Sequence, residues 1–226
     1  MNKFNLLSQA TAIKLFRTTS AIVEYVVIEE ELNELFNYCI LLQESTQDKI
    51  DQLVSEREEL EKESYKRFEF DGIQFKNIDT IDGIENFEIP SWNALFEFTV
   101  PMNQILLISI FLEKSLKSLC AEYSPNNDST YYDGYNLKIK RNRQESLICT
   151  YIKYLEQQCG LKNVSNPTIE YLNQNIRPLR NSFVHGDWMT IKRYTEEIDI
   201  NEVFISVSNL FRIIEEKYLN KSNANI

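Results

Sequence analysis

Apolar residues recur every three or four positions through the first part of the chain, which is the spacing of one face of an α-helix. Between Ser8 and Glu44 the residues with this spacing are Ile22, Val26, Leu32, Leu35, Phe36, Cys39 and Leu42. From Asp48 to Phe68 the spacing continues among many Glu, Lys and Gln residues, which is typical of a more exposed helix with a solvated charged face. The pattern therefore predicts a long helical hairpin that turns near residues 43–47.

After residue 67 the helical spacing gives way to short apolar runs. The apolar residues on the two sides of Asp71-Gly72 are Phe68, Phe70, Ile73 and Phe75. Because Asp-Gly suits the two-residue turn between antiparallel strands, this segment predicts a small β-hairpin. We expect a loop at 76–92, and this loop is the best candidate for a domain boundary.

The segment 92–122 predicts the strongest helix of the chain, with apolar side chains nearly all round it, and such a helix lies at the centre of a protein. Helical spacing also recurs at 144–158 and at 201–219. Between these helices lies a tyrosine-rich polar stretch. The alternating positions that make it a candidate short strand are Tyr135, Leu137 and Ile139.

A further helix is predicted from Asn166-Pro167, an N-cap residue followed by proline at the first helical position. It runs towards Gly186, and a bend is expected at Pro178 because proline cannot donate a backbone hydrogen bond. Gly186 is a suitable C-cap residue, which places His185 in the last helical turn.

The composition fits this mainly helical interpretation. The chain has 226 residues, of which 43% are apolar, with only five Gly and five Pro, so it can bury a sizeable core and an all-β sandwich is not expected. The longest apolar run, Ile105 to Leu112, is far short of the roughly 20 residues that span a bilayer. No segment has the pattern of a signal peptide, so a cytoplasmic location is expected.

The four cysteines have no C-x-x-C spacing, and the chain has a single histidine. A zinc site needs clustered sulfur and nitrogen ligands, which this sequence does not supply. We therefore interpret the cysteines as free, buried thiols in helices. They are Cys39, Cys120, Cys149 and Cys159.

The formal net charge of −10 argues against indiscriminate nucleic-acid binding, which depends on a broad positive surface. The acidic residues gather early, at 29–31 and 56–63, whereas much of the basic charge lies later. The later basic residues are Lys138, Lys140, Arg141, Arg143, Arg177, Arg180, Lys192 and Arg193. A local basic site is therefore compatible with the acidic total.

The only histidine of the chain lies among residues that suit phosphate chemistry. On a helix, positions 177, 181 and 185 share one strip, with 180 beside it, so Arg177, Arg180, Asn181 and His185 can converge. Guanidinium groups donate to phosphate, and imidazole transfers protons near neutral pH. This composition suits cleavage of a phosphodiester without a metal.

A second interpretation is that the two arginines pair with surface carboxylates, while His185 and Trp188 cap and pack a helix. On residue chemistry alone, this second interpretation is the stronger one.

The segment Arg180-Asn181-Ser182-Phe183-Val184-His185 resembles the R-x4-6-H signature of the HEPN superfamily. Its position near the end of a late helix, the polar Asn181 and the following Gly186 strengthen the resemblance. The helix that contains residues 112–117 also resembles the acidic helix that packs beside this motif. The resemblance covers roughly 93–220, and the segment 1–75 lies outside it.

This resemblance implies a mainly α, HEPN-like up-and-down helical bundle, preceded at 1–75 by a hairpin extension for partner or dimer contacts. HEPN proteins usually dimerise so that two motifs face a shared cleft. Many are metal-independent endoribonucleases of toxin–antitoxin or antiviral defence systems, and no cofactor is implied.

The resemblance also implies roles for individual residues. Arg180 would bind the scissile phosphate, His185 would transfer protons, Asn181 would support both, and Glu113 would orient the arginine. The RNA products would carry 2′,3′-cyclic phosphate and 5′-hydroxyl ends. Our own candidates for RNA-backbone contacts are Arg177, Lys138, Lys140, Arg141 and Arg143. For the last four, an ordinary solvated strand edge is an equally good interpretation.

In one respect the sequence departs from some HEPN toxins. Those toxins carry a tyrosine two residues after the histidine, which a nucleotidyltransferase antitoxin modifies, whereas here Gly186-Asp187 follows His185. This puts modification in doubt and leaves open control by a protein antitoxin that blocks the cleft. The alternatives to a homodimeric ribonuclease are a non-catalytic HEPN module, which binds nucleic acid, a nucleotide or a partner protein, and a purely structural helical adaptor.

Overall fold

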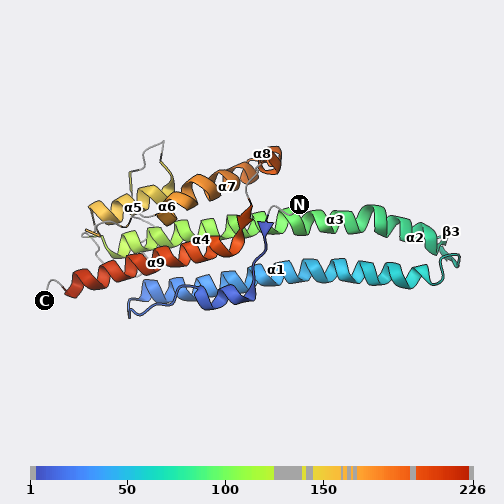
Figure 1. Ribbon diagram of the computed structural model, residues 1–226, viewed down its shortest axis with the longest axis horizontal. Helices are drawn as coiled ribbons and strands as arrows, with labels where there is room; N and C mark the ends of the chain where they lie inside the picture. The colour runs from blue at the N-terminus through green and yellow to red at the C-terminus, as the bar shows by residue number, and fades with distance from the viewer. Residues whose placement is uncertain are drawn as a thin grey trace.

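A computed structural model describes residues 4–124, 139–140, 145–158, 160–161, 164, 167–193 and 197–223. A helical bundle forms one end of the molecule, and an arm of two antiparallel helical segments projects from it (Figure 1). The N-terminal half contains β1 (Phe4–Asn5), the 3₁₀ helix η1 (Gln9–Lys14), α1 (Val23–Glu61), β2 (Arg67–Phe70), β3 (Ile73–Lys76), α2 (Asn77–Gly83), η2 (Ile84–Glu88), α3 (Ile89–Ala94), η3 (Leu95–Thr99) and α4 (Val100–Glu122). The C-terminal half contains α5 (Leu147–Gln157), α6 (Pro167–Tyr171), η5 (Leu172–Ile176), α7 (Arg177–Val184), α8 (Trp188–Arg193), β4 (Ile198–Asp199) and α9 (Ile200–Asn223).

The predicted turn at 43–47 is wrong, because α1 is a single helix of 39 residues that passes through these positions. No glycine or proline occurs between Val23 and Glu61, and the hydroxyl of Thr46 donates to the Leu42 carbonyl at 2.8 Å inside the helix. The polar stretch therefore does not end the helix, and buried positions continue at helical spacing at Thr46, Ile50 and Leu53. The helix also begins later than expected, because residues 8–22 form η1 and an extended segment.

The predicted β-hairpin is confirmed. It joins α1 to α2 at the far end of the arm (Figure 1). Asp71 and Gly72 both have positive φ, 53° and 77°, as a two-residue type I′ turn requires. In the antiparallel register Phe70 lies opposite Ile73, so Phe68, Phe70 and Ile73 share one face of the hairpin, where all three are exposed.

The loop expected at 76–92 is also a wrong prediction, because the chain is helical from Asn77 to Glu122. Two π-helical turns, η2 and η3, lie directly before Ile89-Pro90 and Val100-Pro101. In each, a backbone N–H reaches back five residues, from Ile89 to Ile84 and from Val100 to Leu95. A proline ring clashes with the carbonyl four residues earlier, and the wider turn lets the helix continue past it.

The helix predicted at 92–122 is confirmed and lies centrally in the bundle. Helix α4 packs against α1, α5, α7 and α9, and its buried side chains, such as Met102, Ile105 and Leu116, belong to the main core. The first half of α1 adds its own buried side chains to this same core, the first being Tyr25 and the last Ile40. The division into 1–75 and 93–220 stays a prediction, and the core in the described residues is continuous across it.

One 18-residue stretch within Asn77–Glu122 is apolar enough to cross a membrane by length and composition alone, and 44% of that stretch is buried inside the protein. The core helix of a soluble protein passes the same test. The cellular location therefore stays a prediction.

The predicted helices of the C-terminal half are confirmed, with shifted ends. Helix α5 begins at Leu147, where the Ser146 hydroxyl accepts from the Cys149 N–H at 3.0 Å. Helix α9 extends to Asn223, beyond the predicted end at 219. The candidate strand at Tyr135, Leu137 and Ile139 lies outside the described residues except for Ile139. An unpredicted parallel pair forms where Phe4 and Asn5 of β1 meet Ile198 and Asp199 of β4.

The interpretation of the cysteines as free, buried thiols is confirmed for Cys39 and Cys120, and Cys149 is free and partly exposed. Burial raises the pKa of the Cys39 thiol to about 12. Cys159 lies outside the described residues.

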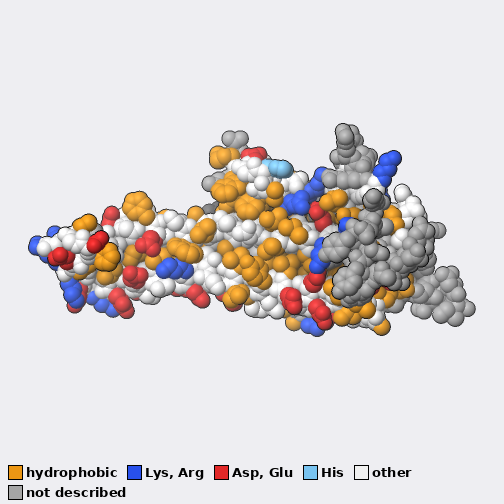
Figure 2. Space-filling model, turned by 180° about the vertical axis from the view of Figure 1, so that it is seen from behind, with side chains coloured by type: hydrophobic (Ala, Val, Ile, Leu, Met, Phe, Trp, Pro, Cys, Tyr) orange, Lys and Arg blue, Asp and Glu red, His pale blue; other side chains and the backbone are white. Residues whose placement is uncertain are grey.

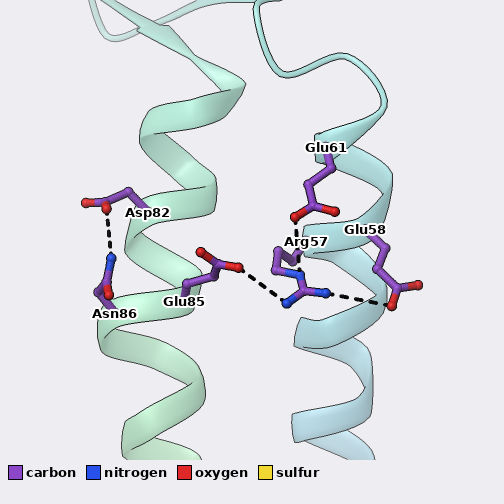
Figure 3. A network of polar contacts seen from close by, with 6 residues as sticks. All are labelled: Arg57, Glu58, Glu61, Asp82, Glu85 and Asn86. Atoms are coloured by element: carbon purple, nitrogen blue, oxygen red, sulfur yellow. Dashed lines mark hydrogen bonds and ion pairs between the residues drawn. The ribbon is translucent and has the colours of Figure 1, made fainter.

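The arm is held together by ion pairs as well as by buried side chains such as Ile50, Leu53 and Ile84. The guanidinium of Arg57 on α1 reaches across to Glu85 on η2 at 3.3 Å and lies 3.8 Å from both Glu58 and Glu61 on its own helix (Figure 3). Such partly exposed pairs contribute about 0.2–1 kcal/mol each, so they position the two helical segments more than they stabilise the fold.

Candidate functional site

Helix α7, which carries the arginine-to-histidine motif, follows a third π-helical turn. The bend predicted at Pro178 stays a prediction; directly before this proline lies η5, in which the Arg177 N–H donates to the Leu172 carbonyl five residues earlier. Helix α7 then packs against α4, with Leu179 buried between them. This packing brings the motif beside the acidic side chain that α4 presents at Glu113.

Arg180 is fixed by two neighbours. Its Nη2 donates to both carboxylate oxygens of Glu113 at 3.3 Å, and its Nη1 donates to Asn181 Oδ1 at 3.2 Å. The side chains of Arg180 and Glu113 are 25% and 22% exposed, so the pair is partly withdrawn from solvent. Both hydrogen bonds to Glu113 come from Nη2 alone, and both are long. This geometry restrains the arginine without forming a closed bidentate pair.

The end of α7 has the hydrogen bonds of a Schellman motif. The Gly186 N–H donates to the Phe183 carbonyl at 3.1 Å, and the Asp187 N–H donates to the Ser182 carbonyl at 2.8 Å. Gly186 has φ +75°, which confirms the predicted C-cap and leaves His185 as the residue that ends the helix. The imidazole is exposed, and within the described part of the chain it has no hydrogen-bond or ion-pair partner.

An aromatic cluster lies directly after the histidine. Trp188, the first residue of α8, stacks on Phe183 with ring centroids 6.0 Å apart and an interplanar angle of 16°. Phe98 of η3 packs against both rings, at 6.3 Å from Phe183 and 5.9 Å from Trp188. The indole N–H donates to the Phe183 carbonyl at 3.4 Å, so the orientation of the tryptophan is set from two sides.

A small cavity of about 20 Å³ lies beside Arg180, with room for about one water molecule. Glu113, Arg177 and Arg180 line its polar side, and Val203 and Val207 of α9 line its apolar side. A nucleotide does not fit in this cavity.

The structure brings together only some of the candidate residues. Arg177 is partly exposed and lines the same cavity as Arg180 and Glu113. Lys140 is exposed and lines a separate hollow with Lys153 and Tyr154 of α5. The other candidates for RNA contacts, Lys138, Arg141 and Arg143, lie outside the described residues.

Sequence reasoning missed Phe98 as part of the surroundings of His185, because its contact with α7 and α8 joins segments about 85 residues apart. It treated Trp188 only as a packing residue. A helix at 188–193 was not expected either, although Asp187 accepts from the Thr190 hydroxyl at 2.6 Å and its N–H at 3.3 Å, which is the pattern of an N-cap.

Comparisons with protein-family models, curated proteins and solved structures find no match to this chain. The resemblance to the HEPN superfamily therefore depends on the motif, on its place at the end of a late helix and on the neighbouring acidic residue.

Proposed function

We propose that the protein is a metal-independent endoribonuclease of the HEPN type that acts in a toxin or antiviral defence system. The observation that carries this proposal is the grouping at the end of α7. An arginine held by a carboxylate and an amide lies five residues before an exposed histidine on one short helix. Arg180 would bind the scissile phosphate, and Glu113 and Asn181 would hold its guanidinium in place.

The proposed reaction needs a base and an acid but no metal. The 2′-hydroxyl of RNA attacks the adjacent phosphorus and gives up its proton to a base. The bond from phosphorus to the 5′-oxygen breaks, and that oxygen takes a proton from an acid, which leaves a 2′,3′-cyclic phosphate and a 5′-hydroxyl. His185 is the only imidazole of the chain, so a second copy would supply the second proton-transfer group.

Support for a homodimer comes from apolar side chains that surround the histidine. Val184 and Met189 are 55% and 59% exposed, and they lie within four residues of His185. Figure 2 shows apolar side chains across the middle of the face on which the histidine is visible. Exposed apolar patches of this kind mark interaction surfaces. Burying them between two copies would bring two motifs to one shared cleft.

The second candidate function is a non-catalytic HEPN module that binds nucleic acid, a nucleotide or a partner protein. One observation favours it: Arg180 already pairs with a carboxylate, while the residues after His185 cap and pack two helices. Such a module would cleave no RNA, with or without Arg180 and His185. The cytoplasmic location and a protein antitoxin belong to the first proposal as expectations.

The test is cleavage of labelled transfer RNA and mixed RNA in EDTA by wild type, His185→Ala and Arg180→Ala, followed by chemical typing of the new 3′ ends. The expected result is cutting that leaves cyclic phosphate, with both variants at least about 100-fold slower. Arg17→Ala is the matched control, because Arg17 is an exposed arginine paired to Glu29 of α1. Absence of cutting, or cutting that survives both substitutions, would leave the binding module as the better conclusion.

A further inference from the structure

The indole of Trp188 is both fixed and exposed. One face of the ring lies nearly parallel to Phe183, and its only donor, Nε1–H, is used by the Phe183 carbonyl. The side chain nevertheless remains 49% exposed. Tryptophan residues that serve the core alone lose most of their exposed surface, whereas this one presents aromatic surface to solvent three residues after His185.

The chain around this tryptophan is locally basic in an acidic protein. The segment 177–193 contains four Arg or Lys residues and a single acidic residue, Asp187, while the whole chain has a net charge of −10. The carboxylate of Asp187 is occupied by Thr190 at the start of α8. Single-stranded nucleic acids are held by this combination, in which cations bind the backbone and an aromatic ring stacks on a base.

We propose that Trp188 is a stacking platform for a nucleobase of single-stranded RNA whose phosphate binds at Arg180. This inference rests on the proposed function for the identity of the ligand, and it adds a residue that positions the substrate without taking part in proton transfer. Phe98 and Phe183 pack against the ring, and the Schellman turn at Gly186 lies between it and His185 in the chain.

The geometry also determines which bases this platform would prefer. Because the indole N–H is engaged by the protein backbone, the ring has no free donor for the edge of a base. Stacking alone is tolerant of sequence, since every base has a π face, and larger bases gain more contact. The expected preference is therefore a modest one for purines over pyrimidines next to the bound phosphate.

Tryptophan fluorescence provides a binding measurement that needs no catalysis. The chain has two tryptophans, so Trp92→Phe leaves Trp188 as the only reporter. The full-length protein is titrated with a 2′-O-methyl oligonucleotide, which cannot be cleaved, and with a matched oligonucleotide that contains one abasic site. The expected result is quenching of Trp188 by the first oligonucleotide and weaker binding of the second when the abasic site lies at the stacked position.

Substitutions separate stacking from apolar contact; because the Trp188 variants lack the reporter, their affinity is measured by the fluorescence anisotropy of an end-labelled oligonucleotide. Stacking on an aromatic side chain contributes about 1–3 kcal/mol per base, so Trp188→Ala is expected to weaken binding of the oligonucleotide by roughly 5- to 150-fold. Trp188→Phe should restore most of this loss. Trp188→Leu, which keeps apolar surface without a ring face, should not restore it. Trp92→Ala, on the arm, is the matched control and should bind as wild type does.

Four results would overturn the proposal, three from binding and sedimentation and one from cleavage. Wild-type affinity in Trp188→Leu would exclude stacking, and equal affinity for every placement of the abasic site would exclude contact with a base. A smaller particle in sedimentation velocity for Trp188→Leu would show that a second copy covers the ring instead.

RNA binding with quenching but no cleavage would count against the ribonuclease while the platform stands. Cleavage that is unaffected by Trp188→Ala would count against the platform alone.

Discussion

At the scale of single residues, the position of the Arg180 guanidinium depends on a side chain from another helix. Asn181 is adjacent in sequence and accepts one hydrogen bond, but it allows the arginine several rotamers. Glu113, 67 residues away, restricts the guanidinium to the side of α7 that faces α4. A flexible side chain that must bind one phosphate geometry gains from such a restraint, because a misplacement of about 1 Å can lower a rate on the order of 100-fold.

This restraint predicts the effect of Glu113→Gln. The substitution keeps the shape of the side chain and removes its charge, so Arg180 loses its counter-charge and part of its orientation. We expect kcat for RNA cleavage to fall by about 10- to 100-fold while the thermal midpoint changes little. Glu113→Asp is the companion variant, because it keeps the charge and should recover part of the rate. Equal rates for wild type and Glu113→Gln would show that the carboxylate has no part in positioning.

At the scale of secondary-structure elements, prolines and glycines determine how the long helices continue and end. In the described residues each π-helical turn is followed directly by an X-Pro pair, at Pro90, Pro101 and Pro178. The wider turn accommodates the proline ring. Helix α7 can therefore follow η5 directly and pack against α4 despite Pro178. The C-terminal end of α7 is set by Gly186, whose left-handed conformation few other residues adopt without strain.

Two glycine substitutions are expected to have opposite effects on stability. A Cβ at Gly186 would contact nothing within 4 Å, so Gly186→Ala suffers only the strain of its φ of +75° and should lower the free energy of unfolding by about 1–2 kcal/mol. Gly83 has helical φ of −60° and equally open surroundings, so Gly83→Ala should raise it by about 0.4–1 kcal/mol. Urea denaturation followed by circular dichroism measures both. Equal shifts would contradict the assigned conformation of Gly186.

At the scale of the whole molecule, the arm and the bundle differ in charge. The helical segments of the arm, 44–61 and 77–99, contain twelve acidic and two basic residues, so their net charge of −10 equals that of the entire chain. The remainder of the protein is therefore neutral overall. The arm would repel RNA, so the proposed RNA site lies on the less acidic part of the molecule.

The ion pairs of Arg57 lead to a prediction about whether the arm can open while the bundle stays folded. Arg57→Ala removes the link from α1 to η2 and should speed amide hydrogen exchange in 50–90, while exchange in α4 and α7 stays as in wild type. Hydrogen-exchange mass spectrometry measures this. Lys49→Ala is the control, because Lys49 lies on the same helix and bonds only within it, to Gln52. Faster exchange throughout the bundle would show that arm and bundle unfold together.

Features that depend on neighbouring residues were predictable from the order of amino acids alone. Asp71-Gly72 specified the hairpin turn, Gly186 specified the end of α7, and the spacing of apolar residues located the central helix at 92–122. These features follow from local backbone preferences and from which side of a helix is apolar. The same local reasoning failed at 43–47 and 76–92, since a polar stretch or a proline ends a helix only when packing does not continue it.

The tertiary structure was needed to show which distant groups meet. It showed Glu113 in contact with Arg180, which the family resemblance implied and periodicity did not. It also placed Phe98 behind Phe183 and Trp188, and it left Trp188 half exposed beside His185. Contacts between residues far apart in sequence depend on how whole helices pack and on what each side chain leaves uncovered. The spacing of residues along one chain specifies neither.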